Sequence, residues 1–244
     1  MKKYDVITVG SAVIDFFVYT KLNERKGNLC LPVGSKLLVE DFAMASGGGG
    51  TNTAVAFSKV GLKTGFIGKV GKDLHGEIIL DELTKERVDF LGSVGNEKTG
   101  VSVILDSARK RRTVLLHKGA NDFLHFNDFH LKNLETKWFY LSSLIGDALH
   151  TEIRIAEWAK MHGVKVAYNI SSYLARDGIG KIRRLLKNVD IFILNEEEAR
   201  DLISRGDFFR TLRELGPKIV CVTYGKRGSK CYNGFKMYEA VPGK

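Results

Sequence analysis

Gly47-Gly48-Gly49-Gly50-Thr51-Asn52-Thr53-Ala54 is the stretch that decides the fold of this chain of 244 residues. Glycine has no Cβ, so the backbone of the four glycines can adopt positive φ and a ligand can approach its N–H groups closely. From Asn52 onward apolar residues recur at helical spacing; Asn52 suits the N-cap of that helix, and Gly61 suits the position after its end. The tetraglycine alone fits a surface loop equally well. Because a capped amphipathic helix follows at once, the order favours a ligand-binding loop.

Around this stretch, apolar strand-like runs alternate with helical patterns, which is typical of a parallel sheet with crossover helices. A chain of this length buries one substantial core, so we expect a single α/β domain over residues 1–244. The expected core strands are 4–9, 64–70, 138–142, 164–169, 191–194 and 218–223. The expected helices are 52–60, 77–87, 151–162, 178–187 and 196–204.

Two other pairs of segments have the alternating pattern of antiparallel strands with one covered and one wet face. They are 16–19 with 35–42, and 99–106 with 111–117. These segments predict a second, smaller sheet.

Further motifs accompany the glycine stretch in a fixed order along the chain. They are Asp15, Thr99-Gly100, Arg112-Thr113, Gly119-Ala120-Asn121, Asn195-Glu196-Glu197-Glu198 and Thr223-Tyr224-Gly225-Lys226-Arg227-Gly228. With Gly48, Gly50, Asn52, Ala54, Gly61 and Gly71, this order resembles the ribokinase-like (PfkB) carbohydrate kinases, from Tyr4 onward. The resemblance implies an α/β, ribokinase-like fold: a mostly parallel central sheet flanked by helices, with a small β-sheet lid near 16–42 and 99–117. In this family the lid covers the sugar and sometimes also forms a homodimer surface.

The family's second signature should follow Lys244, where this sequence stops. That signature is a Gly-Ala-Gly-Asp-like turn that opens a C-terminal helix and carries an Asp as catalytic base. The resemblance therefore implies that the chain is C-terminally incomplete and that its base lies beyond Lys244. We expect the chain as printed to have no useful kinase activity, and a missing helix would leave apolar sheet surface exposed.

Asp15 follows the first strand region, at the kind of strand exit where open α/β sheets bind ligands. A carboxylate can accept hydrogen bonds from two adjacent hydroxyls, although an isolated Asp there is more commonly a surface turn residue. The resemblance implies that Asp15 holds the sugar, with Gly48 and Gly49 contributing backbone groups and Asn52 its amide. Gly49 stands where ribokinase has a lysine, and Val13 stands where a polar residue often precedes the aspartate. The identity of the sugar therefore stays open.

Asn195 and the acidic residues after it end an apolar strand and begin a helix. An Asn N-cap followed by acidic residues is favourable for a helix start by itself. The resemblance also implies that Asn195 and Glu198 organise Mg²⁺ and its waters around ATP, and oxygen ligands acting largely through water suit Mg²⁺. Glu196 and Glu197 have no assigned role, and we expect them to be solvated.

Thr223 and the glycine turn after it join two strand-like runs, as in an ordinary hairpin. The resemblance implies that Thr223 and Gly225 contact the phosphates of ATP. The flanking residues and spacing do not fit a Walker A or Rossmann fingerprint, so a dinucleotide-binding dehydrogenase is disfavoured.

The chain carries 38 Lys and Arg against 28 Asp and Glu, a formal charge of +10. Its basic residues are spread out, and no aromatic residues interleave with the clusters at 109–112 and 181–184. Nucleic acid is therefore not an expected partner, whereas anionic substrates gain some steering from this charge. No apolar run is long enough to span a membrane. The cysteines, an odd set without metal-ligand spacing, predict reduced thiols and a cytoplasmic protein; they are Cys30, Cys221 and Cys231.

These observations predict an ATP-dependent carbohydrate kinase that transfers the γ-phosphoryl group to a sugar hydroxyl, with ATP and Mg²⁺ as cofactors. A nucleoside kinase of the same fold is the nearest alternative. A catalytically silent sugar- or nucleotide-binding protein becomes the favoured alternative if the natural reading frame also ends at Lys244.

Overall fold

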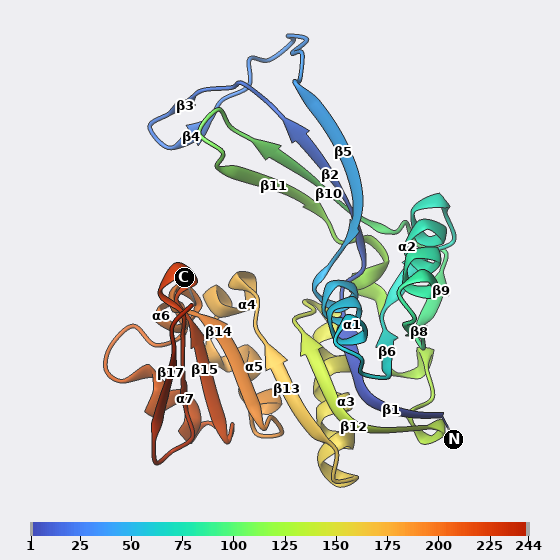
Figure 1. Cartoon of the computed structure of the whole chain (residues 1–244), viewed down its shortest axis with the longest axis vertical. Coiled ribbons are helices and arrows are strands. Elements are labelled where there is room, and N and C mark those ends of the chain that lie inside the picture. The colour runs from blue at the N-terminus through green and yellow to red at the C-terminus, as the bar shows by residue number, and fades with distance from the viewer. Residues whose placement is uncertain (1, 243–244) are drawn as a thin grey trace.

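The computed structural model describes residues 2–242 and is built around a nine-stranded sheet, above which a separate four-stranded sheet projects (Figure 1). The strand order of the large sheet is β17-β16-β15-β14-β13-β12-β1-β6-β8. From β15 to β8 every neighbouring pair is parallel, and β16 and β17 are added antiparallel. The predicted parallel sheet is thus confirmed. The bounds are β1 Lys2–Gly10, β6 Thr64–Ile67, β8 Asp89–Phe90, β12 Leu134–Ser142, β13 Lys165–Asn169, β14 Ile191–Asn195, β15 Ile219–Thr223, β16 Ser229–Tyr232 and β17 Met237–Ala240.

The strand expected over 64–70 is interrupted at Gly68. β6 ends at Ile67, and β7 (Lys69–Gly71) pairs with β9 (Ser93–Gly95) outside the large sheet. A Cβ at residue 68 would collide with the Phe66 ring and the Gly10 carbonyl. The glycine therefore allows the chain to turn away from β1 in a space too narrow for a side chain.

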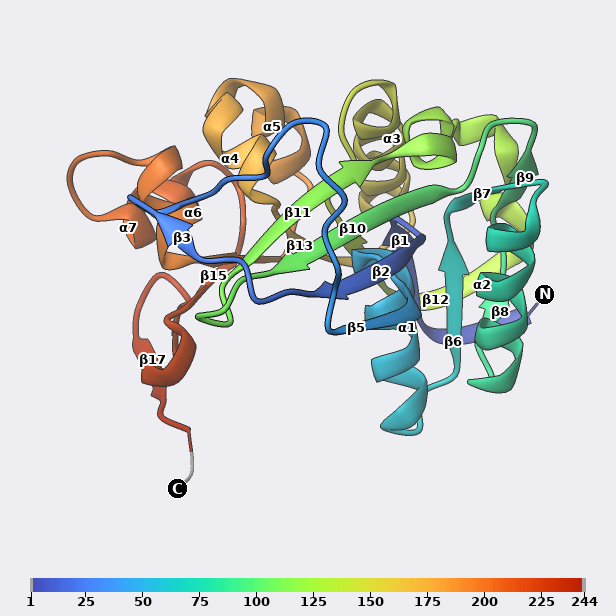
Figure 2. The same ribbon diagram turned by 90° about the horizontal axis from the view of Figure 1, so that it is seen from above.

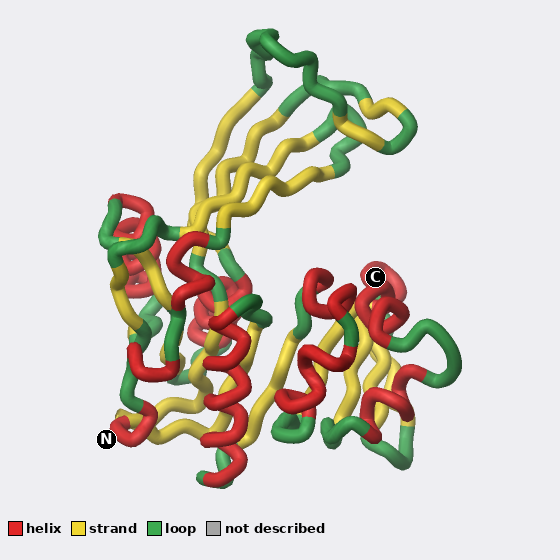
Figure 3. The backbone as a smooth tube through the Cα atoms, turned by 180° about the vertical axis from the view of Figure 1, so that it is seen from behind, coloured by secondary structure: helices red, strands yellow, loops and turns green. Residues whose placement is uncertain are grey.

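The helices lie mostly on one face of the large sheet, as the view from behind shows (Figure 3). Among residues 2–242, the opposite face is covered by helices at the end formed by β1, β6 and β8, where α1 and α2 pack over Phe66 (Figure 1). The bounds are α1 Gly49–Lys59, α2 Leu74–Lys85, α3 Asp147–Met161, α4 Ser172–Asp177, α5 Ile179–Leu186, α6 Glu196–Leu202 and α7 Phe208–Glu214, with short 3-10 helices η1 Gly119–Phe123, η2 Phe126–Asp128, η3 Leu131–Asn133 and η4 Gly225–Arg227. No helix within residues 2–242 is long and apolar enough to cross a membrane.

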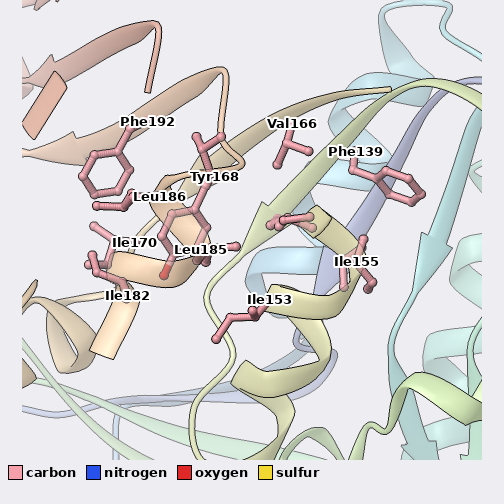
Figure 4. Close-up of a cluster of buried hydrophobic side chains, with 14 of the residues drawn as sticks. Phe139, Ile153, Ile155, Val166, Tyr168, Ile170, Ile182, Leu185, Leu186 and Phe192 are labelled. Carbon is pink, nitrogen blue, oxygen red and sulfur yellow. The ribbon is translucent and has the colours of Figure 1, made fainter. Parts of the chain in front are cut away.

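The main core lies between the sheet and helices α3 to α7 (Figure 4). Alternate residues of the central strands point into it, because successive side chains of a strand face opposite sides. Phe139, Tyr168 and Phe192 are fully buried, and the Tyr168 and Phe192 rings stack with centroids 5.7 Å apart. Burial of each such side chain stabilises the fold by roughly 1.5–3 kcal/mol.

The intervening residues of β12, β13 and β14 point to the opposite face, which is mostly apolar and, apart from the buried Ala167, half-buried at its centre. Tyr140, Ala167, Ile191 and Ile193 lie there and line a hollow of about 470 Å³. Phe57 of α1 packs edge-on against Tyr140, with ring centroids 5.5 Å apart.

The small sheet has the order β11-β10-β2-β5 and overhangs the carboxyl ends of the large sheet's strands, as the view from above shows (Figure 2). β2 (Val13–Tyr19), β10 (Gly100–Asp106) and β11 (Arg112–His117) lie close to the expected segments. The strand expected over 35–42 is wrong, because β5 spans Asp41–Gly47 and pairs antiparallel with all of β2. Between them lies only a short pair, β3 Glu24–Arg25 and β4 Asn28–Leu29.

Cys221 and Cys231 sit opposite each other on β15 and β16 and form a disulfide, with Cα atoms 4.1 Å apart. The expectation of three reduced thiols is therefore wrong for this pair, and only Cys30 is a free thiol among residues 2–242. The two cysteines lie ten residues apart and become cross-strand neighbours only through the hairpin of β15 and β16, which their spacing in the sequence does not reveal. The cysteines consequently give no support for a reducing compartment.

Candidate functional site

Neighbouring parallel strands of the large sheet each end, at their carboxyl end, in a glycine or a polar residue. These ends together form one edge of the sheet, called here the carboxyl edge. Gly10 of β1 is in register with Ser142 of β12, and Ser142 with Asn169 of β13. Further along, Asn195 of β14 is in register with Thr223 of β15. Parallel α/β sheets bind ligands at this edge, and the small sheet rises from it through β2 and β5 (Figure 1).

Asp15 lies on β2 near the base of the small sheet, in register with Ala45 on one side and Ser102 on the other. The buried Ser102 hydroxyl donates a hydrogen bond to Oδ1 of Asp15. Its other carboxylate oxygen lies against Gly47, where any Cβ would collide with it. The half-buried Asp15 side chain is therefore held in place by its neighbours. Sequence reasoning missed Ser102 and Gly47; the alternating pattern after Thr99 was the available signal for Ser102.

Gly48 is the N-cap of α1 and has φ of +108°, a conformation that favours glycine. The helix therefore begins three residues before Asn52, and the predicted Asn52 cap is wrong. The hydroxyls of Thr51 and Thr53 bond to the Gly47 and Gly49 carbonyls, at 2.6 and 2.7 Å, and support this early start.

The glycine N–H groups are largely engaged within the protein. The Gly49 N–H donates to the Ser11 hydroxyl and the Gly50 N–H to the Ser11 carbonyl, both at 3.1 Å. Gly49 also lies so close to Ser142 that a Cβ would collide with its Oγ. These contacts indicate that the glycines bring α1 against the β1–β2 connection and the end of β12. The expectation of freely available glycine amides does not hold for Gly49 and Gly50.

Asn52 is exposed on the first turns of α1, and its side chain has no hydrogen bond to the rest of residues 2–242. Its N–H donates to the Gly48 carbonyl at 2.9 Å. The carboxamide is thus available to a ligand, although it does not contact Asp15.

Asn121 explains the Gly119-Ala120-Asn121 motif. Its buried side chain accepts from the Ala12 N–H at 2.8 Å and donates to the Ala12 carbonyl at 2.9 Å. Gly100 packs against this amide, with no space for a Cβ. Asn121 therefore fixes the segment that leads from β1 into β2 and Asp15.

Asn195 and Glu198 form a reciprocal cap at the start of α6, so the predicted N-cap is confirmed. Asn195 Oδ1 accepts from the Glu198 N–H, and Glu198 Oε2 accepts from the Asn195 N–H, both at 2.8 Å. Glu198 Oε1 accepts from the Ser172 hydroxyl at 3.1 Å, and the side chain is buried.

A Mg²⁺ ion fits this carboxylate only through water. Each oxygen of Glu198 already has one protein donor but retains acceptor capacity for a metal-bound water. Within the part of the chain described, no three His, Cys, Asp or Glu side chains converge as a metal cluster. Mg²⁺ needs no such cluster, because it commonly keeps several waters and takes further oxygens from phosphates.

Thr223 and Gly225 lie beside Asn195 at the far end of the edge. Thr223 is exposed, and Gly225 has φ of +57° with open space around the position of a Cβ. The turn is closed by a hydrogen bond of 2.8 Å from the Tyr224 N–H to the Gly228 carbonyl. These two residues are thus accessible to a ligand on the edge.

Glu196 is tied to this turn. Arg200 donates to its Oε1 at 2.8 Å, and Arg227 of the turn pairs with its Oε2. The hydrogen bond from Arg200 lowers the pKa of Glu196, and Arg227 acts in the same direction. The expectation that Glu196 is merely solvated is therefore wrong, whereas the Glu197 side chain is 77% exposed.

The sequence and the fold are similar to those of known carbohydrate kinases. Residues 3–243 match the model of the pfkB family carbohydrate kinases. The chain is 29% identical over 199 residues to an uncharacterized sugar kinase of Archaeoglobus fulgidus, covering 77% of each chain. It is 28% identical over 242 residues to a ribokinase of Lactococcus lactis, covering 97% of this chain and 75% of the relative.

Among solved structures, the fold is similar to that of Arabidopsis thaliana ribokinase complexed with ribose and ATP. The TM-score is 0.81 at 24% identity, with 98% of this chain and 78% of that chain covered. The predicted ribokinase-like fold is thereby confirmed. The family match over nearly the whole length, on a fold of this kind, establishes that the chain belongs to the pfkB family of carbohydrate kinases.

Proposed function

We propose that this protein is an ATP-dependent carbohydrate kinase that transfers the γ-phosphoryl group of ATP to a sugar hydroxyl. The observation that carries the proposal is the arrangement along one sheet edge. Asp15, Gly48 and Gly49 stand near the β1 end, and Asn195 and Thr223 stand near the β15 end, with Ser142 and Asn169 between them. Phosphoryl transfer depends chiefly on positioning and on electrostatic stabilisation of charge, and such an edge can align two substrates.

On the sugar side, the carboxylate of Asp15 would accept hydrogen bonds from sugar hydroxyls. Ser102 occupies only one position on its Oδ1, so acceptor capacity remains on both oxygens. Gly48 and Gly49 would form the wall of the pocket by allowing close approach, and the exposed amide of Asn52 would complete it. The small sheet overhanging this edge would act as the lid (Figure 2).

On the nucleotide side, Asn195, Thr223 and Gly225 would contact the phosphates of ATP. Glu198 would hold Mg²⁺ through water, and the ion would neutralise phosphate charge. We assign no residue of this chain as the base that accepts the hydroxyl proton. A cytoplasmic location stays a prediction.

A homodimer through the small sheet is the partner arrangement that we propose. Leu115, Val103, Phe16 and Met44 form a row across all four strands, on the face opposite Asp15. Leu115 and Met44 are 56% and 46% exposed, and exposed apolar surface of this kind commonly marks a contact site.

The test is an assay of ADP release with the protein expressed from its natural gene, Mg²⁺ and ATP, and a panel of pentoses, hexoses and nucleosides. We expect release that depends on a sugar. Release only with nucleosides would replace the proposal by the nucleoside-kinase alternative. Binding of sugar and ATP by calorimetry without any release would favour a silent binding protein.

A further inference from the structure

Glu152 is a wholly buried carboxyl group whose position the proposed function does not explain. It lies on α3 with no exposed surface, and its Oε2 accepts a hydrogen bond of 3.1 Å from the Leu144 N–H. Its Oε1 is buried without a hydrogen-bond partner among residues 2–242. A buried polar atom without a partner costs free energy, so an apolar residue would serve packing better. The cost points to a role for the bond to Leu144.

Leu144 belongs to the segment 142–144 that leaves β12 at the carboxyl edge. Ser143, in the middle of that segment, has a saturated hydroxyl. Its Oγ lies 3.0 Å from the Tyr168 hydroxyl, accepts from the Ser171 N–H at 2.8 Å and donates to the Asn169 carbonyl at 3.1 Å. Hydrogen bonds thus fix the segment to β13 and the residues after it through Ser143, and to α3 through Leu144.

The first residue of the segment reaches the glycine stretch. Ser142 Oγ lies over Gly49, where a Cβ would collide with it. A displacement of the segment would therefore move Ser142 relative to the start of α1, which borders the proposed sugar pocket. Glu152 itself has no hydrogen bond to Ser142 or Gly49, and its one side-chain bond within residues 2–242 is that to Leu144.

Burial raises the pKa of Glu152 to about 8, against the opposing effects of the Leu144 N–H and Lys118. Lys118, just before η1, has its own pKa lowered by burial, with Asp122 and Glu152 acting in the opposite direction. Tyr168 of β13 is the other titratable group that interacts with Glu152, and its pKa is raised well above the usual value by burial. Glu152 is therefore mostly protonated at neutral pH.

We propose that Glu152 is a positioning residue, which anchors the segment 142–144 through Leu144 and so sets the Ser142 side of the sugar pocket. This inference rests on the proposed function, because it takes the Ser142 end of the segment as part of the proposed sugar pocket. The neutral carboxyl group accepts from Leu144 without placing a charge in the core. At alkaline pH the ionised carboxylate places a charge in the core that the single N–H of Leu144 does not compensate. The structure around Glu152 then opens, the segment loosens, and the sugar is held less tightly.

The sign of the pH effect follows from the raised pKa. The folded state binds the proton of Glu152 more tightly than the unfolded state does. The stabilisation that protonated Glu152 contributes is therefore fully present below its ordinary pKa of 4.5. It is lost as pH rises through the pKa of about 8 in the folded protein. Glu152→Gln keeps a neutral acceptor of the same shape and should remove this part of the pH dependence.

The experiment compares wild type, Glu152→Gln, Glu152→Ala and the control Thr151→Val at pH 6.5 and pH 9. Thr151 is the buried neighbour on α3, and its hydroxyl bonds instead to the Leu124 carbonyl at 2.8 Å. The readouts are hydrogen exchange of the Leu144 amide and calorimetric affinity for ATP and for the tightest binder among D-ribose, 2-deoxy-D-ribose, D-fructose and adenosine.

At pH 6.5 we expect Glu152→Ala to speed exchange at Leu144 and weaken sugar affinity about tenfold, with ATP affinity unchanged. Glu152→Gln should match wild type at pH 6.5 and lose less affinity than wild type at pH 9. Unchanged sugar affinity in Glu152→Ala, an equal loss in Thr151→Val, or a wild-type pH response in Glu152→Gln would overturn the inference alone. Failure of the wild type to bind any of the four probes would overturn the proposed function as well.

Discussion

Asn195 and Glu198 each accept a hydrogen bond from the other's backbone N–H at 2.8 Å, so that one pair of side chains closes the start of α6. These two residues therefore have a structural role, which is to cap α6, and a proposed functional role, which is to bind phosphate and Mg²⁺. The carboxylate also accepts from Ser172, which ties α6 to α4.

Mutation can separate the capping role from the proposed binding role. Asn195→Ala removes the cap acceptor, and we expect a loss of about 0.5–2 kcal/mol in the free energy of unfolding. Glu198→Gln keeps an acceptor oxygen but loses the charge, so turnover should fall strongly and the Mg²⁺ requirement should rise with little change in stability. Urea unfolding and ADP release measured on both variants check this.

Glu197→Gln is the matched control, because Glu197 occupies the same turn of α6 with an exposed side chain. It should leave both quantities near their wild-type values. Normal turnover and Mg²⁺ dependence in Glu198→Gln would restrict Glu198 to its capping role.

Asp15→Ala tests the sugar side. Loss of charge-assisted hydrogen bonds from a sugar should cost about 1.5–3 kcal/mol, or roughly one to two decades in affinity, while ATP affinity stays nearly intact. Asp41→Ala, at the distant end of the small sheet, should change neither affinity. Calorimetry that finds wild-type sugar affinity in Asp15→Ala would remove this residue from the site.

The pattern of strands and crossover helices could be predicted because it depends on local apolar periodicity. The Asn195 cap could also be predicted, because its donor lies three residues away. The start of α1 could not be predicted. Glycine has a low helix propensity, which hides the helical turn at Gly49 and Gly50. Gly48 lies so close to the Ser11 carbonyl that a Cβ would collide with it, and the sequence does not reveal this tertiary contact.

The errors and omissions in the small sheet and the site have a common physical cause. Alternation identified strands but not their register, and β5 is placed by its pairing with β2 rather than by its own sequence. Ser102 bonds to Asp15 across 87 residues, and Asn121 to Ala12 across 109. Such partners are unpredictable from one sequence, because spacing along the chain carries no information on which distant strands meet.

The two faces of β14 should respond differently to truncation. Phe192→Ala removes a fully buried ring, and we expect a loss of about 3–5 kcal/mol. Ile193→Ala, one residue later on the half-buried open face, should cost less than about 2 kcal/mol. Denaturant unfolding measures both values, and equal losses would contradict the assignment of an open face.

The disulfide predicts a definite thiol count. Thiol titration of the unreduced, unfolded protein should detect one thiol, that of Cys30, and titration after reduction should detect three. Reduction should also lower the melting temperature, because disulfides typically stabilise proteins by about 2–4 kcal/mol. Cys30→Ser is the control, and its melting temperature should shift on reduction as that of the wild type does. Three thiols before reduction would show that Cys221 and Cys231 are not bonded.

The proposed dimer surface can be tested at its most exposed strand. Leu115 of β11 is 56% exposed and lies in the apolar row on the face opposite Asp15. A charge in the core of a dimer contact is unfavourable, so Leu115→Glu should yield monomers in sedimentation velocity experiments at concentrations where the wild type is dimeric. Met161→Glu alters an equally apolar side chain, 75% exposed at the end of α3, and should leave the dimer intact. Monomeric wild type at all concentrations, or dimers that persist in Leu115→Glu, would exclude this face as the contact.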